Sequence, residues 1–430
     1  MLPLNRLPLP NTKSLEPRLD ARIRVRQTWP MLQRLPHLLI LALLILPALI
    51  GGCSAAAHNR TDDTPARPIE LEPIEIKTDR TGGQPLTYVK EHDALVDQAM
   101  EQFRAEKWDD AVRLYAILLK TYPDTPGAGA IAYNSGLALQ KLGRHAEAVQ
   151  QFALARLKNA GTRNARDALF LQAESLEMAG EITAAAVLYR EALDDPKTQE
   201  QIGGELGVLD ALEAAARQGM LWKQAGEIKS ADDAFRKVER LYNDHRDVQT
   251  VGESVWVARS FFERGELYRE LFASIRFKLP VERMKRDLED KANLFLKAEN
   301  AYYHCVRLHH KQWSLAAGHH IGGLYTQLID DIDNAEVPPE IGVTLADVYR
   351  DELWNHTEKL AKRAIVIYRK NIELGKTLGA AESDWVSKSE QGLSRMMDTI
   401  ERNTARRGRL LQEGAVKPGE HKDPPTSPPQ

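Results

Sequence analysis

The chain has 430 residues, of which 43% are hydrophobic and 28% are charged, with a formal net charge of −3. This length exceeds what one hydrophobic core usually sustains, so it predicts an extended array or two domains. The near-neutral charge gives no electrostatic footprint for nucleic acid, and two cysteines exclude a disulfide scaffold. Without residues 1–52 the net charge falls to −8, because seven basic and two acidic residues are removed. We therefore expect no nucleic-acid partner.

The first 52 residues contain the only long apolar run of the sequence, residues 38–52. The run is shorter than the ~20 residues that a membrane-spanning helix needs, and it has the length of the apolar region of a signal peptide. Five prolines precede Met31, which favours translation from Met31 over translation from Met1. Residues 1–52 are predicted to be a signal peptide, with an uncleaved N-terminal anchor as the alternative.

The end of this run, Leu49 to Cys53, resembles the lipobox of bacterial lipoproteins. The resemblance implies that Cys53 is lipidated and becomes the mature N-terminus, and several acyl chains at ~0.8 kcal/mol per buried methylene make such an anchor effectively permanent. Ser54 stands where many lipoproteins retained in the inner membrane have Asp. The resemblance therefore implies the periplasmic leaflet of the outer membrane, with an inner-membrane lipoprotein as the less favoured alternative.

Two polar segments flank the central part of the chain. Residues 53–88 are interrupted by proline and glycine and have little to bury, which predicts a flexible tether. Residues 404–430 are charged and rich in proline, which predicts a disordered tail. A proline-rich ligand for a partner is the alternative for the tail.

Residues 89–247 contain a repeat of 37 residues, marked by Ala111, Ala148 and Ala185. An aromatic residue follows each alanine by four positions, and a small residue precedes each by twelve. Small residues allow close approach of two helices, and the aromatic ring fills the space between neighbouring hairpins. A fourth unit follows after an insertion. The pattern comprises Ala99, Tyr115, Gly136, Phe152, Ala173, Tyr189, Gly219, Ala231 and Phe235, with turn glycines at Gly143, Gly180 and Gly226.

The segments 114–124, which includes Pro123, and 133–152 resemble the tetratricopeptide repeat. The resemblance implies an all-α superhelix of about four helical hairpins over residues 89–247. Residues 248–403 keep helical periodicity without the repeat and predict longer, irregular hairpins, with helices at 281–308, 313–333, 341–374 and 383–402. The layout of lipobox, tether, repeats and long helical end resembles deltaproteobacterial envelope lipoproteins, including a tetratricopeptide lipoprotein of myxobacterial gliding motility.

Motifs for catalysis or cofactor binding are absent from the sequence, including the Walker loop, the dinucleotide-binding glycines, His-Glu-x-x-His and Gly-x-Ser-x-Gly. We therefore expect a non-enzymatic protein without a cofactor. Five of the twelve histidines fall between His304 and His320, but His304 and His309 lack the i, i+4 spacing of zinc-binding helices. A surface cluster or partner contact is favoured over a metal site, and Cys305 is expected to be a packing thiol. A periplasmic metal- or ligand-binding receptor remains the alternative.

In tetratricopeptide arrays the first helix of each hairpin lines a concave groove. The resemblance places eight residues there: Phe103, Tyr133, Asn134, Leu137, Gln140, Phe170, Glu174 and Glu177. This mixture suits an extended peptide or helix of some basic character, and Asn134 can pair with a peptide backbone. Val96, Asp97 and Leu171 replace the Lys, Asn and Arg that bind terminal carboxylates in related repeats. The alternative is that partners dock on the C-terminal half.

These features together predict a membrane-anchored scaffold that binds other envelope proteins. A component of a gliding machine, an outer-membrane protein assembly lipoprotein and a secretin pilotin are the concrete options. The long helical end argues against the last two, which are generally shorter. No small-molecule substrate is expected.

Overall fold

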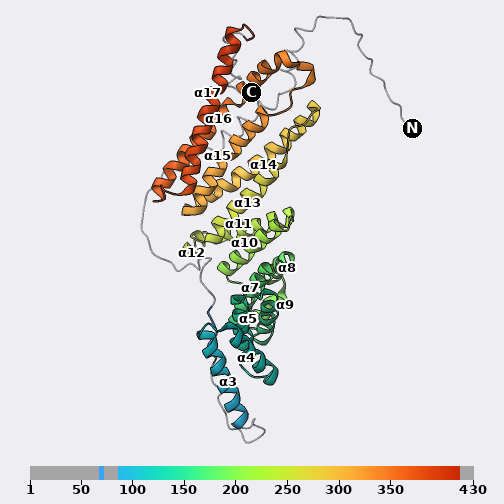
Figure 1. The fold of residues 1–430 in the computed structure, drawn as a ribbon, viewed down its shortest axis with the longest axis vertical. Coiled ribbons are helices and arrows are strands. Elements are labelled where there is room, and N and C mark those ends of the chain that lie inside the picture. Colours follow the sequence, from blue (N-terminus) through green and yellow to red (C-terminus); the bar gives the residue numbers. More distant parts are fainter. Residues whose placement is uncertain (1–66, 72–85, 417–430) are drawn as a thin grey trace, which may run out of the picture.

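The computed structural model describes residues 67–71 and 86–416. The predicted signal peptide, Cys53 and most of the predicted tether lie outside the described residues. Within that part of the chain the backbone forms helices and no strand, and the helices stack along one long axis from α3 to α17 (Figure 1). The predicted all-α fold of tetratricopeptide-like hairpins, continued by longer helices, is confirmed.

The N-terminal half consists of four helical hairpins in which each helix packs against the next. Their helices are α3 (Leu86–Arg104), α4 (Trp108–Thr121), α5 (Ala128–Lys141), α6 (His145–Lys158), α7 (Arg163–Met178), α8 (Ile182–Asp194), α10 (Val208–Gln224) and α11 (Ile228–Asp244). Two short helices, α9 (Pro196–Gln201) and α12 (Gln249–Gly252), lie in the connections. The α9 connection is the insertion that separates the third and fourth sequence repeats.

The repeated alanines and aromatic residues occupy the cores of these hairpins. Ala148 and Phe152 of α6 are both 0% exposed, and a Cβ atom built on Gly136 of α5 would lie 2.7 Å from the Phe152 ring. The fourth unit repeats the contact, since a Cβ atom on Gly219 would lie 2.6 Å from Phe235. These are the packing positions that the 37-residue pattern predicts.

Glycines in a left-handed conformation end the first helices of three hairpins. Gly143, Gly180 and Gly226 have φ angles of +72°, +84° and +78°. L-residues with a Cβ atom rarely adopt this conformation, whereas glycine does so at no steric cost. The sequence therefore fixes where α5, α7 and α10 stop.

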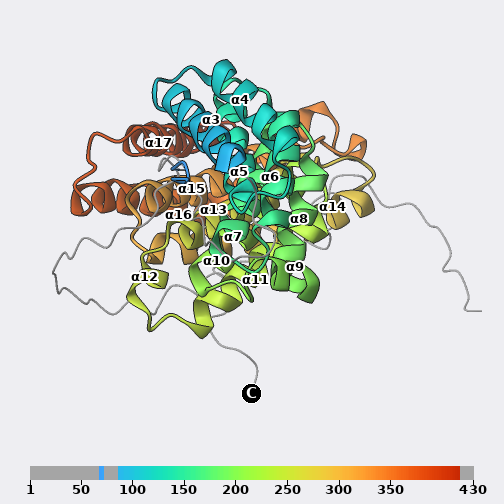
Figure 2. The ribbon, with the colours of Figure 1, turned by 90° about the horizontal axis from the view of Figure 1, so that it is seen from below.

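The C-terminal half continues the stack with longer helices. They are α13 (Val255–Ser274), α14 (Val281–Arg307), α15 (Lys311–Asp333), α16 (Ala346–Thr377) and α17 (Asp384–Gln412), with 3₁₀ turns at Pro339–Ile341 and Val343–Leu345. Figure 2 views the stack along its axis, where α14 and α17 extend on opposite sides. The described residues contain no helix that is both long enough and apolar enough to cross a bilayer.

Two predicted boundaries in this half differ from the structure. The predicted tail starts at residue 404, whereas α17 continues to Gln412, because Leu410 is buried and Arg407 lies 3.2 Å from the Asp351 carboxylate of α16. The helix predicted from residue 341 begins at Ala346, because Gly342 has a φ angle of +69° and two 3₁₀ turns come first.

The buried apolar residues of the described part fall into three successive clusters, which run from Val96 to Leu171, from Leu169 to Leu267 and from Leu212 to Met396. Each cluster shares helices with the next one. This arrangement is typical of repeat proteins, in which a hairpin is stabilised by its immediate neighbours.

Candidate functional site

An extended segment of the chain, residues 67–71, lies against helices α3 and α5. The backbone N–H of Ile69 donates to Oδ1 of Asn134 at 2.8 Å, and Nδ2 of Asn134 donates to the carbonyl oxygen of Ile69 at 2.8 Å. Both backbone polar groups of one residue are thereby satisfied by one side-chain amide. We call residues 67–71 the N-terminal segment, and the surface of α3 and α5 around Arg104 and Asn134 the docking face.

The side chains of the N-terminal segment alternate between the docking face and its rim. Ile69 and Leu71 are half-buried and pack against the core of the first hairpins. Glu70, which lies between them, accepts a hydrogen bond from Nη2 of Arg104 at 2.6 Å. Alternation with a period of two is the geometry of an extended strand. The docking face therefore holds an aliphatic, acidic, aliphatic sequence.

The ion pair between Arg104 and Glu70 is exposed on both sides, with 60% and 69% of the two side chains accessible. Exposed pairs of this kind contribute about 0–1 kcal/mol. The apolar contacts and the Asn134 pairing are therefore expected to contribute more to the docking than this ion pair, in which Arg104 places a positive charge beside the residue between the two aliphatic side chains. The residue that docks here is acidic, whereas the sequence predicts a partner of some basic character, and that expectation stays a prediction.

The amide of Asn134 is fully buried, and neighbouring side chains hold it in place. Its Nδ2 lies 3.5 Å from Sδ of Met100, and the hydroxyl of Tyr115 donates to the same sulfur at 3.3 Å. Burial raises the pKa of Tyr115 well above its ordinary value, so this hydroxyl stays neutral. Asn134 is thus fixed by its surroundings before any partner binds.

The other predicted groove residues have different environments. Three are core residues: Phe103, Tyr133 and Leu137 are 8%, 5% and 5% exposed, and the ring of Tyr133 packs edge-to-face on Phe152 at 5.9 Å. The expectation that they offer apolar surface to a ligand is corrected accordingly, because all three belong to the buried core of the first hairpins.

The remaining members of the predicted set lie nearer the surface of α5 and α7. Nε2 of Gln140 donates to Oγ of Ser175 at 3.0 Å and links the two helices. Phe170 is half-buried against Tyr189 at 5.6 Å, Glu177 is half-buried and Glu174 is exposed. Among the predicted groove residues, Asn134 forms two hydrogen bonds with the backbone of the N-terminal segment.

The N-terminal segment and Arg104 were not predicted as a site. Residues 68–76 read Pro-Ile-Glu-Leu-Glu-Pro-Ile-Glu-Ile, an alternation of aliphatic and acidic residues in an otherwise polar stretch. Such alternation is the sequence signal of a half-buried extended segment. It distinguishes this part of the predicted tether from the rest.

A second group of aromatic residues lies in the C-terminal half, with tryptophans near the starts of three helices: the buried Trp256 of α13 and the half-buried Trp313 of α15 and Trp385 of α17. The guanidinium of Arg259 lies 5.8 Å from the Trp256 ring and 5.7 Å from the Trp313 ring, and Nζ of Lys388 lies 4.1 Å from the Trp385 ring. These contacts stabilise the side chains against one another.

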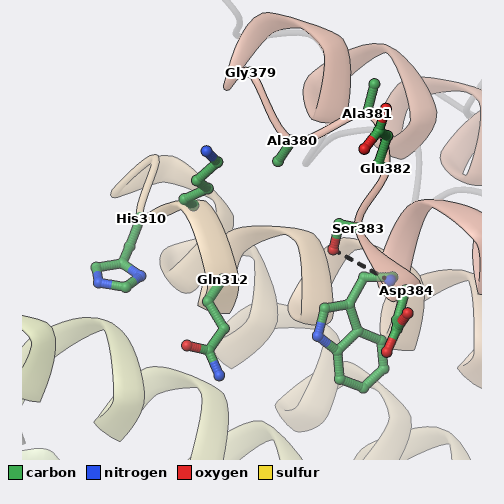
Figure 3. A pocket seen from close by; sticks show the side chains of 10 residues that line it. His310, Gln312, Gly379, Ala380, Ala381, Glu382, Ser383 and Asp384 are labelled. Carbon is green, nitrogen blue, oxygen red and sulfur yellow. Dashed lines mark hydrogen bonds between the residues drawn. The ribbon is translucent and has the colours of Figure 1, made fainter.

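An open depression of about 800 Å³ adjoins Trp385 (Figure 3). It lies between His310–Gln312, where α15 begins, and Gly379–Trp385, where α16 connects to α17. The backbone N–H of Trp385 donates to Oγ of Ser383 at 3.3 Å, a bond that begins α17. The lining comes mainly from helix ends and one turn, and we assign no ligand to it.

His304, His319 and His320 pack against other aromatic rings, whereas His309 is exposed and His310 is half-buried just before α15. His304 stacks on Phe261 at 5.1 Å, and His320 stacks on Tyr302 at 5.7 Å. Burial lowers the pKa of His319 to about 4, so it is neutral at pH 7. Among residues 67–71 and 86–416, no three His, Cys, Asp or Glu side chains gather as a metal site would require. The five histidines therefore do not form one surface cluster, because three pack against aromatic rings while His309 faces solvent.

Cys305 is fully buried, and its Sγ donates to the carbonyl oxygen of Ala258 at 3.3 Å. Burial raises the pKa of this thiol, which disfavours the reactive thiolate. The predicted packing role agrees with this environment.

Three comparisons with known proteins were made, by family, by sequence and by structure. No curated protein matches the sequence. A tetratricopeptide repeat protein from Parabacteroides merdae ATCC 43184 is 13% identical, with 70% of this chain and 99% of that one covered and a TM-score of 0.31. BtubC (BKLC) from P. vanneervenii is 14% identical, with 70% and 95% covered and a TM-score of 0.27. Residues 96–163, which span the docking face and the first sequence repeats, match the family model of the tetratricopeptide repeat.

Proposed function

We propose that this protein is a non-enzymatic interaction scaffold that binds an extended peptide of a partner on the docking face. The observation that supports this most is the pairing of Asn134 with both backbone groups of Ile69. Backbone pairing accepts many sequences, while apolar contacts on either side add affinity and some specificity. Repeats of this type generally bind proteins, and the long stack of hairpins offers further surface.

The proposed place of action is the periplasmic face of a bacterial outer membrane, with a lipid on Cys53 as the anchor. The lipobox resemblance of residues 49–53 supports this location. The partners would then be envelope proteins, and a gliding machine is the favoured setting, with outer-membrane protein assembly and secretin assembly as alternatives. Mass spectrometry of the mature N-terminus tests the anchor, since an unmodified peptide spanning Gly52, Cys53 and Ser54 in most molecules would contradict it.

Cross-linking in the native cell, followed by purification, tests the binding role of the docking face. Asn134→Ala should remove the main cross-linked partner and leave the protein folded at the membrane. Asn300→Ala, an exposed change on α14, serves as the matched control. Recovery of the partner at the wild-type level with Asn134→Ala would exclude the docking face. Loss of the partner with Trp385→Ala would then locate binding on the C-terminal half.

A further inference from the structure

The segment that occupies the docking face comes from this chain itself. Asn134 and Ile69 are 65 residues apart, and Arg104 and Glu70 are 34 residues apart. Arg104 is the last residue of α3, whereas the chain enters α3 at Leu86, so the segment contacts the far end of the helix that follows it. The contact is thus a long-range docking rather than the local start of a helix.

We propose that residues 67–71 are an internal ligand of the docking face, which a partner peptide must displace. The proposal rests on the proposed function, because it names the competitor of the partner at that same site. It also states the chemistry of the partner: an extended stretch with two aliphatic side chains that flank a carboxylate. Such a stretch would reproduce the pairing with Asn134, the two apolar contacts and the ion pair with Arg104.

The sequence contains the docked motif twice. Pro-Ile-Glu-Leu at residues 68–71 is followed by Pro-Ile-Glu-Ile at residues 73–76. Both copies present the aliphatic, acidic, aliphatic order that the docking face holds. An experiment that disables the internal ligand must therefore change both copies, because the second could take the place of the first.

A ligand on the same chain competes strongly even when its own affinity is low. A short connection gives an effective concentration on the order of 1 mM. For a peptide with an intrinsic Kd near ~0.1 mM, the occupied face would bind an external copy about tenfold more weakly than the vacant face. Internal docking would thus raise the affinity that an external peptide needs, and weak, nonspecific peptides would not bind.

The first test measures amide hydrogen exchange of residues 67–71 in the full chain. The Ile69 amide should exchange slowly in the wild type and in the control Gln140→Ala, whose amide bonds to Ser175. It should exchange at the rate of a free peptide in Asn134→Ala. Fast exchange in the wild type would overturn the proposal. Protection that disappears on dilution would also overturn it, because the segment would then come from a second copy of the chain.

The second test measures competition with a fluorescent synthetic peptide of residues 66–72. The vacant variant carries four changes, Ile69→Ser, Glu70→Lys, Ile74→Ser and Glu75→Lys, which disable both copies of the motif. The peptide should bind the vacant variant at least about tenfold more tightly than it binds the wild-type chain. A peptide with Lys in place of Glu70 should bind the vacant variant more weakly than the unchanged peptide does. When Arg104→Glu is added to the vacant variant, the Lys peptide should bind more tightly than the unchanged one. Equal affinity for the wild type and the vacant variant would overturn the internal ligand, as would binding to neither.

The outcomes separate this proposal from the proposed function. Slow exchange and competition together with a partner that survives Asn134→Ala would support internal docking and contradict the binding role. Loss of the partner in Asn134→Ala, together with fast exchange of the Ile69 amide in the wild type, would support the binding role and contradict internal docking. If both proposals hold, the vacant variant should cross-link more of the partner than the wild type does.

Discussion

The ring of Tyr368 fills the place that a side chain on Gly322 would need: a Cβ atom there would lie 2.4 Å from Cε1 of the ring. The same relation joins Gly136 and Phe152 in the N-terminal half, at 2.7 Å. The partners are 46 residues apart in the first pair and 16 in the second. The C-terminal half therefore keeps the helix-to-helix contact of the sequence repeats, although its spacing differs.

Gly322→Ala is expected to lower the free energy of unfolding by about 1–3 kcal/mol, because even a methyl group overpacks this contact. The adjacent Gly323 offers a matched control, since a Cβ atom there would have no neighbour within 4 Å. Gly323→Ala should be neutral or stabilise α15 by roughly 0.5–1 kcal/mol. Chemical denaturation followed by circular dichroism measures both, and equal midpoints would show that the contact is looser than the structure indicates.

Gly136→Ala is expected to destabilise the first half of the array by a similar ~1–3 kcal/mol. A second substitution, at Phe152, tests whether the two residues share one contact. Phe152→Leu alone should cost stability by removing ring contacts, but in the Gly136→Ala background it should recover part of the loss by making room. A double-mutant cycle with a coupling energy near zero would indicate that the two residues do not share one contact.

The N-terminal hairpins could be predicted because the small residue of the first helix and the aromatic residue of the second keep one spacing, as Gly136 and Phe152 do across their turn. In the C-terminal half α14 and α16 have 27 and 32 residues, so Tyr302 and Tyr368 fall outside any fixed period. The pairs became recognisable only once the helices were packed. Sequence reasoning therefore predicted helices there without their register.

The candidate site was likewise only partly predictable from the sequence. Asn134 was predicted as a backbone-pairing residue from its position in the repeat, whereas its occupant was not. Residues 68–71 looked like tether because a polar, proline-containing stretch has too little apolar surface to fold alone. Their alternation of aliphatic and acidic residues can be interpreted only once the contacts with Asn134 and Arg104 are known. Those contacts are distant in sequence and form through long-range packing. Exposure of Tyr133 was misjudged because its ring turns toward Phe152.

Lys291 of α14 is 0% exposed, and its replacement should be among the most damaging changes in the chain. Its Nζ donates to the carbonyl oxygens of Phe272 and Ile275 at 2.6 and 3.0 Å and lies 2.8 Å from the Asp331 carboxylate. Lys291→Met would leave those carbonyls and part of a buried charge unpaired, at a cost of about 2–4 kcal/mol. Arg286→Met, an exposed change on the same helix, should cost less than about 0.5 kcal/mol.

Glu299 of α14 is a buried carboxyl with one hydrogen-bond donor. It is 5% exposed, and Tyr325 of α15 donates to its Oε1 at 2.7 Å. Burial raises the pKa of Glu299 from 4.5 to about 7, against the opposing effects of Tyr325 and of the Arg363 charge. In the unfolded chain the carboxyl titrates near its ordinary value, so the folded protein holds a proton that the unfolded chain has already lost.

Because the pKa of Glu299 is higher in the folded state, its contribution to stability is complete below pH 4.5 and is lost as pH rises to about 7. Glu299→Gln removes this titration while keeping an acceptor for Tyr325. Relative to the wild type, the variant should therefore gain roughly 2–3 kcal/mol between pH 4.5 and pH 8, an order-of-magnitude value. Other groups with lowered pKa values, such as His319, titrate in both proteins and cancel in the difference. Urea denaturation across this range measures it, and a difference independent of pH would mean that Glu299 is solvated and ionised throughout.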